Sequence, residues 1–436
     1  MMMANSQNNE KKIAIVGAGI SGLHCAKILK SKGFNVTVFD KNSEIGGRMQ
    51  TSEIDGFLID HGFHVLQTAY PETSKNINYK SLECKPFKSG ARIVSLNNGK
   101  IRMKLIADPW RNPIAGFFSL FNGFLSFKDL LRFALLRRTI MKGKIDQLFD
   151  GNDGSTLEYL QERKLSNNAI NRFFLPLFGG IFLESKLQTS ERLFRFIFRM
   201  MAKGKMVLPK NGINSVPFTI AQEIGMDNIR LGVEISRIEN KALRFRGEAH
   251  RFDLVIKAFN EPQEGDGKHV WTVYFDAPKS PLRSKHILLN SNLADSSSIV
   301  SHVAVPSDIQ PSYAPSGRSL VAATVVGDRA IEMGLESEDS IEESVRNDLG
   351  TWFGDGTVST WKTLTIQHIA HALPISNPGE RLTNVPKNGD DAIECGDHML
   401  HGSVEGAMLS GRNSALIAIN RLKNNSEPVQ GPKKKV

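Results

Sequence analysis

Apolar positions fall into three kinds of segment along the chain. Residues 13–41 begin with the apolar run IAIV. They continue through glycines into a helical pattern that ends at Lys32-Gly33, and then through the β-branched run NVTVFD. Residues 110–205 have a helical pattern rich in Phe, Leu and Arg, whereas residues 268–330 hold four runs that alternate as antiparallel strands do. A strand–helix–strand start followed much later by a sheet-rich block predicts a discontinuous two-domain protein.

Composition narrows the class without choosing a ligand. The chain has 436 residues, of which 40% are hydrophobic and 23% charged, as in an ordinary globular protein. The net charge of +10 suits an anionic cofactor, an acidic membrane surface or nucleic acid equally. The three cysteines are far apart, so they predict no disulfide framework and favour a reducing compartment such as the cytoplasm. No apolar leader and no run of 18 apolar residues is present, so we expect no spanning helix.

The glycines that follow the first apolar run carry the clearest chemistry. The motif GAGISG contains Gly17, Gly19, Ile20, Ser21 and Gly22. Its first glycine permits a tight turn, the second lets the backbone approach a pyrophosphate, and the third lets the helix pack close to the strand. The amides of the helix N-terminus then face the phosphates, so the motif predicts dinucleotide binding.

Two features downstream strengthen that prediction. Asp40 ends the next strand about 20 residues on, where a carboxylate can accept hydrogen bonds from ribose and would repel the 2′-phosphate of NADP. Gly46, Gly47 and Arg48 follow closely, and a guanidinium donates to phosphate oxygens in a planar fork. Lys41 lies beside the acidic residue.

The order of these motifs resembles the flavin amine oxidase and phytoene desaturase superfamily. GAGISG, FDK, IGGR and GFLIDHGFHVL are similar to its FAD-binding half, and ECGDHMLHGSVEGAMLSGRNSALIAI is similar to its closing flavin motif. The resemblance extends from about residue 11 to 422. The segment GFHVLQTAYPE is closer to the phytoene-desaturase-like members than to the monoamine oxidases.

The resemblance implies a set of cofactor contacts. The glycine loop and Arg48 would serve the diphosphate of FAD, and Asp40 its adenine-side ribose. The other implied cofactor residues are Gly62, Phe63 and His64 along the flavin, Ile235 at adenine, Gly396 and Asp397 at the ribityl or diphosphate region, and Val404 at the pyrimidine edge. Two positions depart from the family pattern: Asp40 stands where Glu is usual, and no aromatic residue precedes Gly396, which disfavours an amine substrate.

We therefore expect an α/β protein in which a Rossmann-type FAD-binding domain is combined with a discontinuous substrate domain of mixed β-sheet and helices. The predicted boundaries are 11–109, 206–262 and 385–423 for the FAD-binding domain, 110–205 and 263–384 for the substrate domain, and 1–10 and 424–436 for flexible tails.

The expected activity is FAD-dependent oxidation, desaturation or isomerisation of a small apolar, carotenoid-like substrate, with hydride transfer to flavin. Two alternatives stay open: a flavin amine oxidase that uses oxygen, and a non-enzymatic protein of this fold that binds lipid tails. We expect non-covalent FAD, because Cys395 precedes the ribityl-side Gly-Asp and predicts a packed thiol. The residues single out no catalytic acid–base pair, no metal site and no nucleic-acid partner, and the oligomeric state is left open.

Arginines alternate with apolar residues in the segment RLFRFIFRMMAKGKM, where Arg192, Arg195 and Arg199 share one helical face. We expect the Phe-rich residues 114–135 and 173–201 to line the substrate cavity. This arginine-containing segment has two interpretations. It lines a core or substrate tunnel with its arginines at the solvent, or it rests peripherally on a membrane with its arginines at lipid phosphates.

Overall fold

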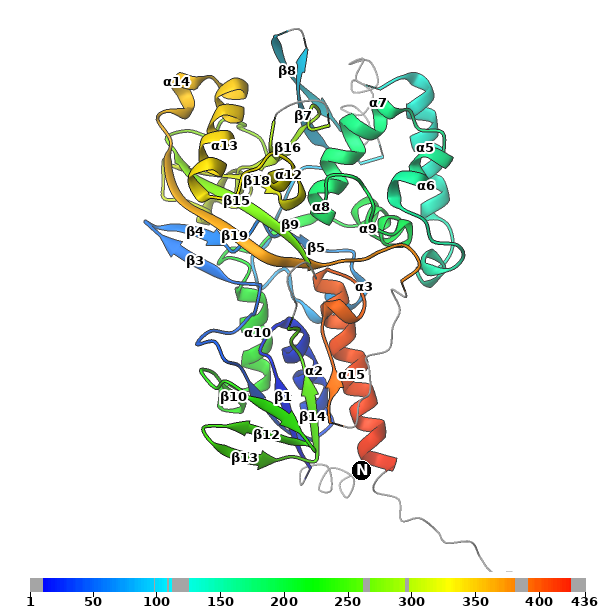
Figure 1. Cartoon of the computed structure of the whole chain (residues 1–436), viewed down its shortest axis with the longest axis vertical. Coiled ribbons are helices and arrows are strands. Elements are labelled where there is room, and N and C mark those ends of the chain that lie inside the picture. The colour runs from blue at the N-terminus through cyan, green and yellow to red at the C-terminus, as the bar shows by residue number, and fades with distance from the viewer. Residues whose placement is uncertain are drawn as a thin grey trace, which may run out of the picture. The chain divides into compact units, whose positions relative to one another are not determined.

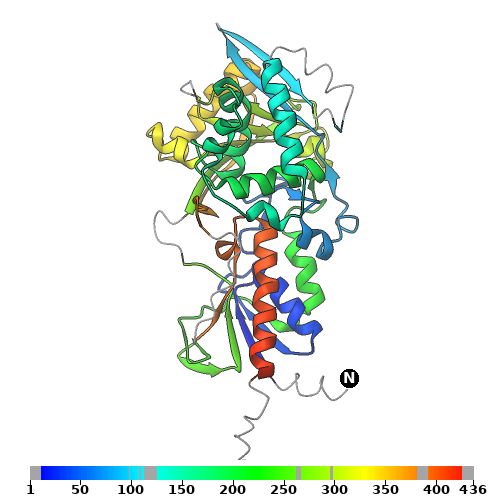
Figure 2. The same cartoon turned by 90° about the vertical axis from the view of Figure 1, so that its right-hand side faces the viewer.

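The computed structural model describes most of the chain and divides it into two compact units (Figures 1 and 2). The described residues are 11–97, 99–107, 110–111, 125–261, 267–294, 298–380 and 391–424. Within them, the first unit comprises 11–49, 216–261 and 391–424, and the second comprises 50–215 and 267–380. The predicted tails lie outside the described residues, except Asn424, which ends a helix.

A parallel sheet forms the centre of the first unit. In its described residues the sheet has five strands in the order β10-β2-β1-β14-β20. Their bounds are β1 Lys12–Val16, β2 Asn35–Phe39, β10 Ile229–Arg230, β14 Leu254–Lys257 and β20 Ile393–Glu394. Helix α2 (Ile20–Ser31) connects β1 to β2, which pair in parallel. This strand–helix–strand unit confirms the Rossmann-type prediction.

Helix α15 (Val404–Asn424) lies beside α2 in both views, as the red and blue helices of Figures 1 and 2. The two helices approach closely at Gly411, where an added Cβ would lie 2.4 Å from the carbonyl oxygen of Ser21. Segments nearly four hundred residues apart are thereby joined. The other elements of this unit are α10 Ser215–Ile224, η3 Met226–Asn228, β11 Arg237–Glu239, β12 Ala242–Phe245, β13 Glu248–Arg251 and η5 Asp397–Met399.

The second unit contains a mixed sheet whose described strands follow the order β19-β15-β18-β17-β16-β7-β8. Their bounds are β7 Ala91–Asn97, β8 Lys100–Ile106, β15 Gly267–Ala277, β16 Ile287–Asn290, β17 Val300–Ala304, β18 Ser319–Val326 and β19 Lys362–Pro374. Neighbouring strands are antiparallel except β16 and β7. The four runs predicted as antiparallel strands are β15 to β18, so that prediction is confirmed.

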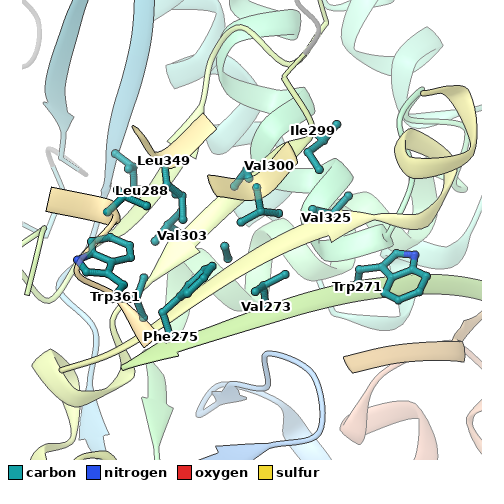
Figure 3. Packing of buried hydrophobic residues seen from close by; sticks show 14 of the residues in the cluster. Trp271, Val273, Phe275, Leu288, Ile299, Val300, Val303, Val325, Leu349 and Trp361 are labelled. Carbon is teal, nitrogen blue, oxygen red and sulfur yellow. The ribbon is translucent and has the colours of Figure 1, made fainter. Parts of the chain in front are cut away.

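From Trp271 on, every second residue of β15 contributes an apolar side chain to one face of this sheet. Trp271, Val273 and Phe275 point to the same side and pack with residues of β17, β18 and α13 (Glu338–Phe353), among them Leu349 (Figure 3). Successive side chains of a strand point to opposite faces, so these three residues share one face, where they are almost completely buried. They form a hydrophobic core between this face of the sheet and α13.

Four of the described helices complete the second unit, and three of them contain more than one Phe residue. The three are α5 Phe127–Met141, the π-helix η2 Ile170–Gly179 and α9 Glu191–Lys203, and the fourth is α6 Thr156–Glu162. Phe174, Phe178 and Phe194 are fully buried in one cluster, and the ring centroids of Phe178 and Phe194 are 4.6 Å apart. Aromatic side chains therefore join η2 to α9.

The remaining described elements of the second unit are short. They are β3 Thr51–Ile54, β4 Phe57–Asp60, β5 Leu66–Gln67, α3 Pro71–Asn76, β6 Lys85–Pro86, η1 Asp146–Phe149, α7 Asn167–Ala169, α8 Gly180–Phe182, β9 Met206–Leu208, α11 Pro306–Ile309, η4 Pro311–Tyr313, α12 Gly327–Glu332 and α14 Asp355–Val358.

The division between the units differs from the predicted boundaries. Residues 50–109 were expected with the FAD-binding domain, but the described part of that range belongs to the second unit because β7 pairs with β16. Residues 206–215 also belong there, since β9 pairs with β5 and β6. Strand pairing across long sequence separations decides both differences, and no local pattern reveals it.

Candidate functional site

The glycine loop after β1 is shaped by close backbone packing at two positions and by open space at the third. Gly17 has φ +115°, and an added Cβ there would lie 2.6 Å from the carbonyl oxygen of Ala258. At Gly22 a Cβ would lie 2.1 Å from the carbonyl oxygen of Gly17. At Gly19 a Cβ would meet nothing within 4 Å. Gly17 and Gly22 are therefore required by the fold, whereas Gly19 faces the space that a diphosphate would fill.

Helix α2 begins at that open space. Gly19 is its N-cap residue, and no side chain caps the helix. The amides of the first turn, at Ile20, Ser21 and Gly22, have no acceptor within a helix. The hydroxyl of Ser21 is buried 2.8 Å from the Sγ atom of Cys395, so its side chain is engaged in the interior. Only main-chain groups of this turn are therefore offered to a phosphate.

The second pair of glycines packs against the first loop. The amide of Gly46 donates to the carbonyl oxygen of Ala18 at 3.0 Å. Gly47 has φ +60°, and a Cβ there would lie 3.3 Å from the Cα atom of Gly19. The two loops that sequence analysis assigned to phosphate are thus in contact, and Arg48 follows directly.

Asp40 stabilises the glycine loop. It is 8% exposed, its Oδ2 accepts from the amide of Ala18 at 2.7 Å, and its Oδ1 accepts from the amide of Asn42 at 2.8 Å. A carboxylate oxygen can accept a second hydrogen bond, so the ribose contact stays a prediction. Lys41 is exposed, and Ile235 packs at the edge of the apolar cluster around Val233.

An ion pair joins the N-terminal glycine segment to the closing flavin motif. The Nη2 atom of Arg48 lies 2.5 Å from the Oδ1 atom of Asp397, although 349 positions separate these residues. The Asp397 side chain is only 10% exposed, and its Oδ1 also accepts from the amide of His398 at 3.1 Å. The resemblance assigned both residues to the cofactor but did not predict the pair. The ion pair could have been predicted, because the two residues have opposite charges and the resemblance places both near the diphosphate.

The turn around Gly396 leads from β20 into α15. Gly396 has φ +150°, and its amide donates to the Ser410 hydroxyl at 3.0 Å. The Ser403 hydroxyl accepts from the amide of Gly406 at 3.0 Å, so Val404 begins the helix. The predicted contacts of Gly396 and Val404 with flavin remain predictions.

His401 belongs to this turn and was missed as a functional candidate. It is 3% exposed, and burial lowers the pKa of its imidazole to about 4, against the opposing charge of Asp397. Its Nδ1 lies 3.0 Å from the Ser403 hydroxyl. The ring is therefore neutral near pH 7 and acts through hydrogen bonds. In the sequence His401 stands three positions after His398, a spacing that without a third ligand predicts no metal site, and no other pattern singles it out.

Cys395 is a packed thiol, as expected. It is fully buried, and burial raises the pKa of its thiol above the ordinary value. A neutral thiol held against Ser21 is a poor nucleophile. Among the described residues, no three His, Cys, Asp or Glu side chains gather in a way that could hold a metal ion.

The segment predicted to line the flavin lies in the second unit. The amide of Gly62 donates to Oε1 of Gln367 at 2.8 Å, and His64 Nε2 lies 2.9 Å from the carbonyl oxygen of His61. The Phe63 ring is 6.2 Å from that of Phe87. The contact of these residues with flavin stays a prediction.

A cavity of about 170 Å³ opens within the second unit. Five phenylalanines line it together with aliphatic residues and cations. The described lining residues are Phe87, Lys88, Ser89, Gly90, Ala91, Ile106, Ala107, Arg111, Phe133, Arg137, Phe173, Leu177, Phe178, Phe198, Met201, Ala202, Gly204, Lys205, Met206 and Ile287. Phe133, Phe173, Phe178 and Phe198 come from the segments expected to line a substrate cavity. Residues 114–124 of that expectation lie outside the described residues.

The α9 arginines are held by groups of the second unit, which favours the first of their two interpretations, a role in the interior. Arg199 is 4% exposed and donates to the carbonyl oxygens of Lys142, Gly143 and Lys144. Arg192 donates to the carbonyl oxygen of Gly151, and Arg195 lies 3.5 Å from Glu191. These side chains stabilise the chain before α6 and are not available to lipid phosphates.

The family model for flavin-containing amine oxidoreductases matches residues 20–263 and 256–418. The chain therefore belongs to this family, and membership implies a flavin cofactor. The open space at Gly19, the uncapped start of α2 and the Arg48–Asp397 pair fit such a group.

Individual relatives are distant. The chain is 24% identical over 277 residues to the 4,4′-diapophytoene desaturase of Staphylococcus aureus, covering 56% of this chain and 54% of the relative. It is 27% identical over 173 residues to protoporphyrinogen oxidase 2 of Arabidopsis thaliana, covering 39% of this chain and 32% of the relative. The matches thus span about half or less of these curated relatives.

Solved structures share the fold. Cyclohexylamine oxidase from Brevibacterium oxydans has a TM-score of 0.70 at 16% identity, with 95% of this chain and 99% of that chain covered. An oxidoreductase from Methanosarcina mazei has a TM-score of 0.68 at 19% identity, with 94% and 100% covered.

Proposed function

We propose that this protein is an FAD-dependent oxidoreductase that oxidises, desaturates or isomerises an extended apolar, polyene-like molecule. The observation that carries this proposal is the Phe-lined cavity of the second unit, present in a chain whose first unit offers an open glycine loop. When bound, flavin supplies a two-electron acceptor for hydride. The residues of the chain then have to bind it, orient the substrate and exclude water.

Non-covalent FAD is favoured by the side chains of the first unit. The main-chain amides of the α2 N-terminus and the Arg48 guanidinium would hold a diphosphate. The Asp40 carboxylate is placed at the end of β2, where an adenosine ribose is held in dinucleotide folds. The thiol of Cys395 is buried against Ser21, which opposes a covalent link at that residue.

The substrate class follows from what lines the cavity. The aromatic side chains in its described lining are all Phe, which have no hydroxyl or N–H group to direct a polar substrate. Phe87 belongs to this wall and also contacts Phe63, in the segment predicted to line the flavin. This contact supports a substrate route that ends beside that segment.

The cavity also disfavours an amine. Its described lining holds four cationic side chains and no carboxylate, so an ammonium group would be repelled. The residues before Gly396 are Ile393, Glu394 and Cys395, none of them aromatic. For this reason we do not adopt the amine oxidase alternative, although the shared fold includes amine oxidases.

A peripheral membrane contact through α5 accompanies this proposal. Phe127, Leu131 and Leu135 recur every four residues on α5 with exposed fractions of 83%, 55% and 53%. Lys128 and Arg138 are exposed on the same helix. An apolar stripe flanked by cations suits an anionic lipid surface, from which an apolar substrate could be taken. No helix in the described ranges is both long and apolar enough to cross a bilayer.

The cofactor part is tested by denaturing the purified protein, filtering it and identifying the released nucleotide. Free FAD in the filtrate is expected, with no yellow colour left on the polypeptide. Colour that stays with the polypeptide, or a nucleotide other than FAD, would contradict this part.

The substrate part is tested by anaerobic reduction of the flavin with apolar polyenes and with small primary amines. Rapid bleaching by amines alone would overturn the proposed substrate class.

A further inference from the structure

Four cationic side chains from four separate segments converge on the Phe-lined cavity. Lys88 lies between β6 and β7, Arg111 follows β8, Arg137 is on α5, and Lys205 lies between α9 and β9. The tertiary fold brings these cations together, because each of the four segments contributes only one of them to the described lining. The described lining residues include no Asp or Glu.

Neutral groups orient the two arginines. The Arg137 guanidinium lies over the ring of Trp110, 4.4 Å from its centroid. Nη1 of Arg111 donates to the hydroxyl of Ser89 at 3.3 Å. Stacking over an aromatic ring holds the Arg137 guanidinium in place without cancelling its charge. In the described part of the chain, no carboxylate lies within ion-pair distance of Lys88, Arg137 or Lys205.

Apolar walls and a cationic rim together favour an amphipathic ligand. A wholly neutral hydrocarbon would make no use of Arg137 and Lys205, and a small anion would make no use of the phenylalanines. A carboxylate or phosphate accepts two parallel hydrogen bonds from a guanidinium and pairs with an ammonium as a point charge. Arg137 is half-buried in the cavity that Phe133 and Phe198 also line, which strengthens its pair with an anion relative to bulk water, whereas Lys205 is exposed and adds a weaker attraction.

We propose that the cavity binds an apolar molecule that ends in an acidic head group, with the apolar body among the phenylalanines and the head group at Arg137 and Lys205. This inference rests on the proposed function, because it assigns the same cavity to the substrate and narrows its class. A conjugated polyene acid fits both parts. An amine with the same apolar body does not.

The test uses the purified, flavin-loaded protein and a fluorescent tetraene fatty acid, cis-parinaric acid, with its neutral methyl ester as the matched ligand. The acid is expected to bind at least about tenfold more tightly than the ester at pH 7.5, the size of one charge-assisted contact. Dodecanoate and dodecyl phosphate, added as competitors, distinguish a carboxylate head group from a phosphate.

Neighbouring residues on the same segments supply matched control variants. Arg137→Gln and Lys205→Gln should weaken binding of the acid and leave binding of the ester unchanged. Arg138→Gln and Lys203→Gln, which alter exposed cations outside the described lining, should weaken neither.

Each outcome separates this inference from the proposed function. Equal affinity for acid and ester, or equal losses in Arg137→Gln and Arg138→Gln, would overturn the acidic head group and leave an apolar-substrate cavity. Failure of both acid and ester to bind would overturn the cavity's assignment to substrate as well.

Discussion

The glycine loop of the first unit and the cavity of the second would recognise their proposed ligands by different means. The loop is built from two short stretches, residues 17–22 and 46–48, and it presents backbone to a phosphate. The cavity is built from side chains between Phe87 and Ile287, contributed by strands, helices and connections. Backbone recognition of this kind follows from a local motif. Side-chain recognition depends on how distant segments assemble.

Two glycine substitutions test whether the loop separates binding from folding. Gly22→Val places atoms against the Gly17 carbonyl oxygen, so we expect overpacking to cost roughly 3 kcal/mol or more of unfolding free energy. Gly19→Val points into open space, so stability without flavin should stay near wild type while flavin affinity falls roughly a hundredfold or more. Urea unfolding and flavin titration measure these effects. Normal flavin occupancy in folded Gly19→Val would show that the motif is only structural.

Asp60 tests whether buried side chains, in contrast to the backbone of the glycine loop, determine the stability of the second unit. It accepts hydrogen bonds from the Thr51 hydroxyl, the Ile213 amide and the Tyr313 hydroxyl. Burial nevertheless raises its pKa from 3.8 to about 6, since desolvation outweighs these donors. The folded state therefore holds the proton more tightly than the unfolded state. This contribution to stability is fully present below about pH 4 and is lost as pH rises to about 6.

Asp60→Asn removes this titration. Relative to wild type, its unfolding free energy should rise by up to about 3 kcal/mol between pH 4 and pH 7. Urea unfolding at a series of pH values measures the difference. Asp55→Asn, an exposed position on the same hairpin, is the control and should show no such change. Parallel curves for wild type and Asp60→Asn would contradict the prediction.

What could be predicted from sequence follows the same contrast. The glycine loop, Asp40 and the four strands β15 to β18 were predicted because each is encoded by residues adjacent in the chain. The sequence left two roles open for Arg199 because its carbonyl partners lie more than fifty positions earlier. The cavity's cations could not be foreseen, since nothing in four separated segments indicates that they meet.

Asp397 sharpens the account of the first unit. Asp397→Ala removes the partner of Arg48, so flavin affinity should fall about tenfold, a loss of about 1.4 kcal/mol. Asp391→Ala is the matched variant, because Asp391 is exposed and accepts only from the Asn240 amide among the described contacts. Titration of the apoprotein with FAD measures both affinities. Equal losses would mean that the role assigned to Asp397 is misplaced.

The α5 stripe is expected to give the smallest effect. Leu131→Gln removes a half-exposed apolar side chain, so co-sedimentation with phosphatidylglycerol vesicles should weaken roughly tenfold or less. Leu416→Gln, at a leucine 48% exposed on α15, should not change it. Absence of vesicle binding by the wild type at low salt would remove the membrane contact. Dimerisation that is lost in Leu131→Gln would assign the stripe to a second copy.

The most direct test of the central claim, that an apolar substrate occupies the cavity of an FAD enzyme, is anaerobic flavin reduction in a cavity-filling variant. Ala202 lines the cavity, and Lys203 is its exposed neighbour on α9. Wild type and Lys203→Trp should be bleached by a polyene acid, whereas Ala202→Trp should keep its flavin spectrum and bleach at least roughly a hundredfold more slowly, because the indole occupies the substrate's volume. Bleaching of Ala202→Trp at the wild-type rate would contradict the account.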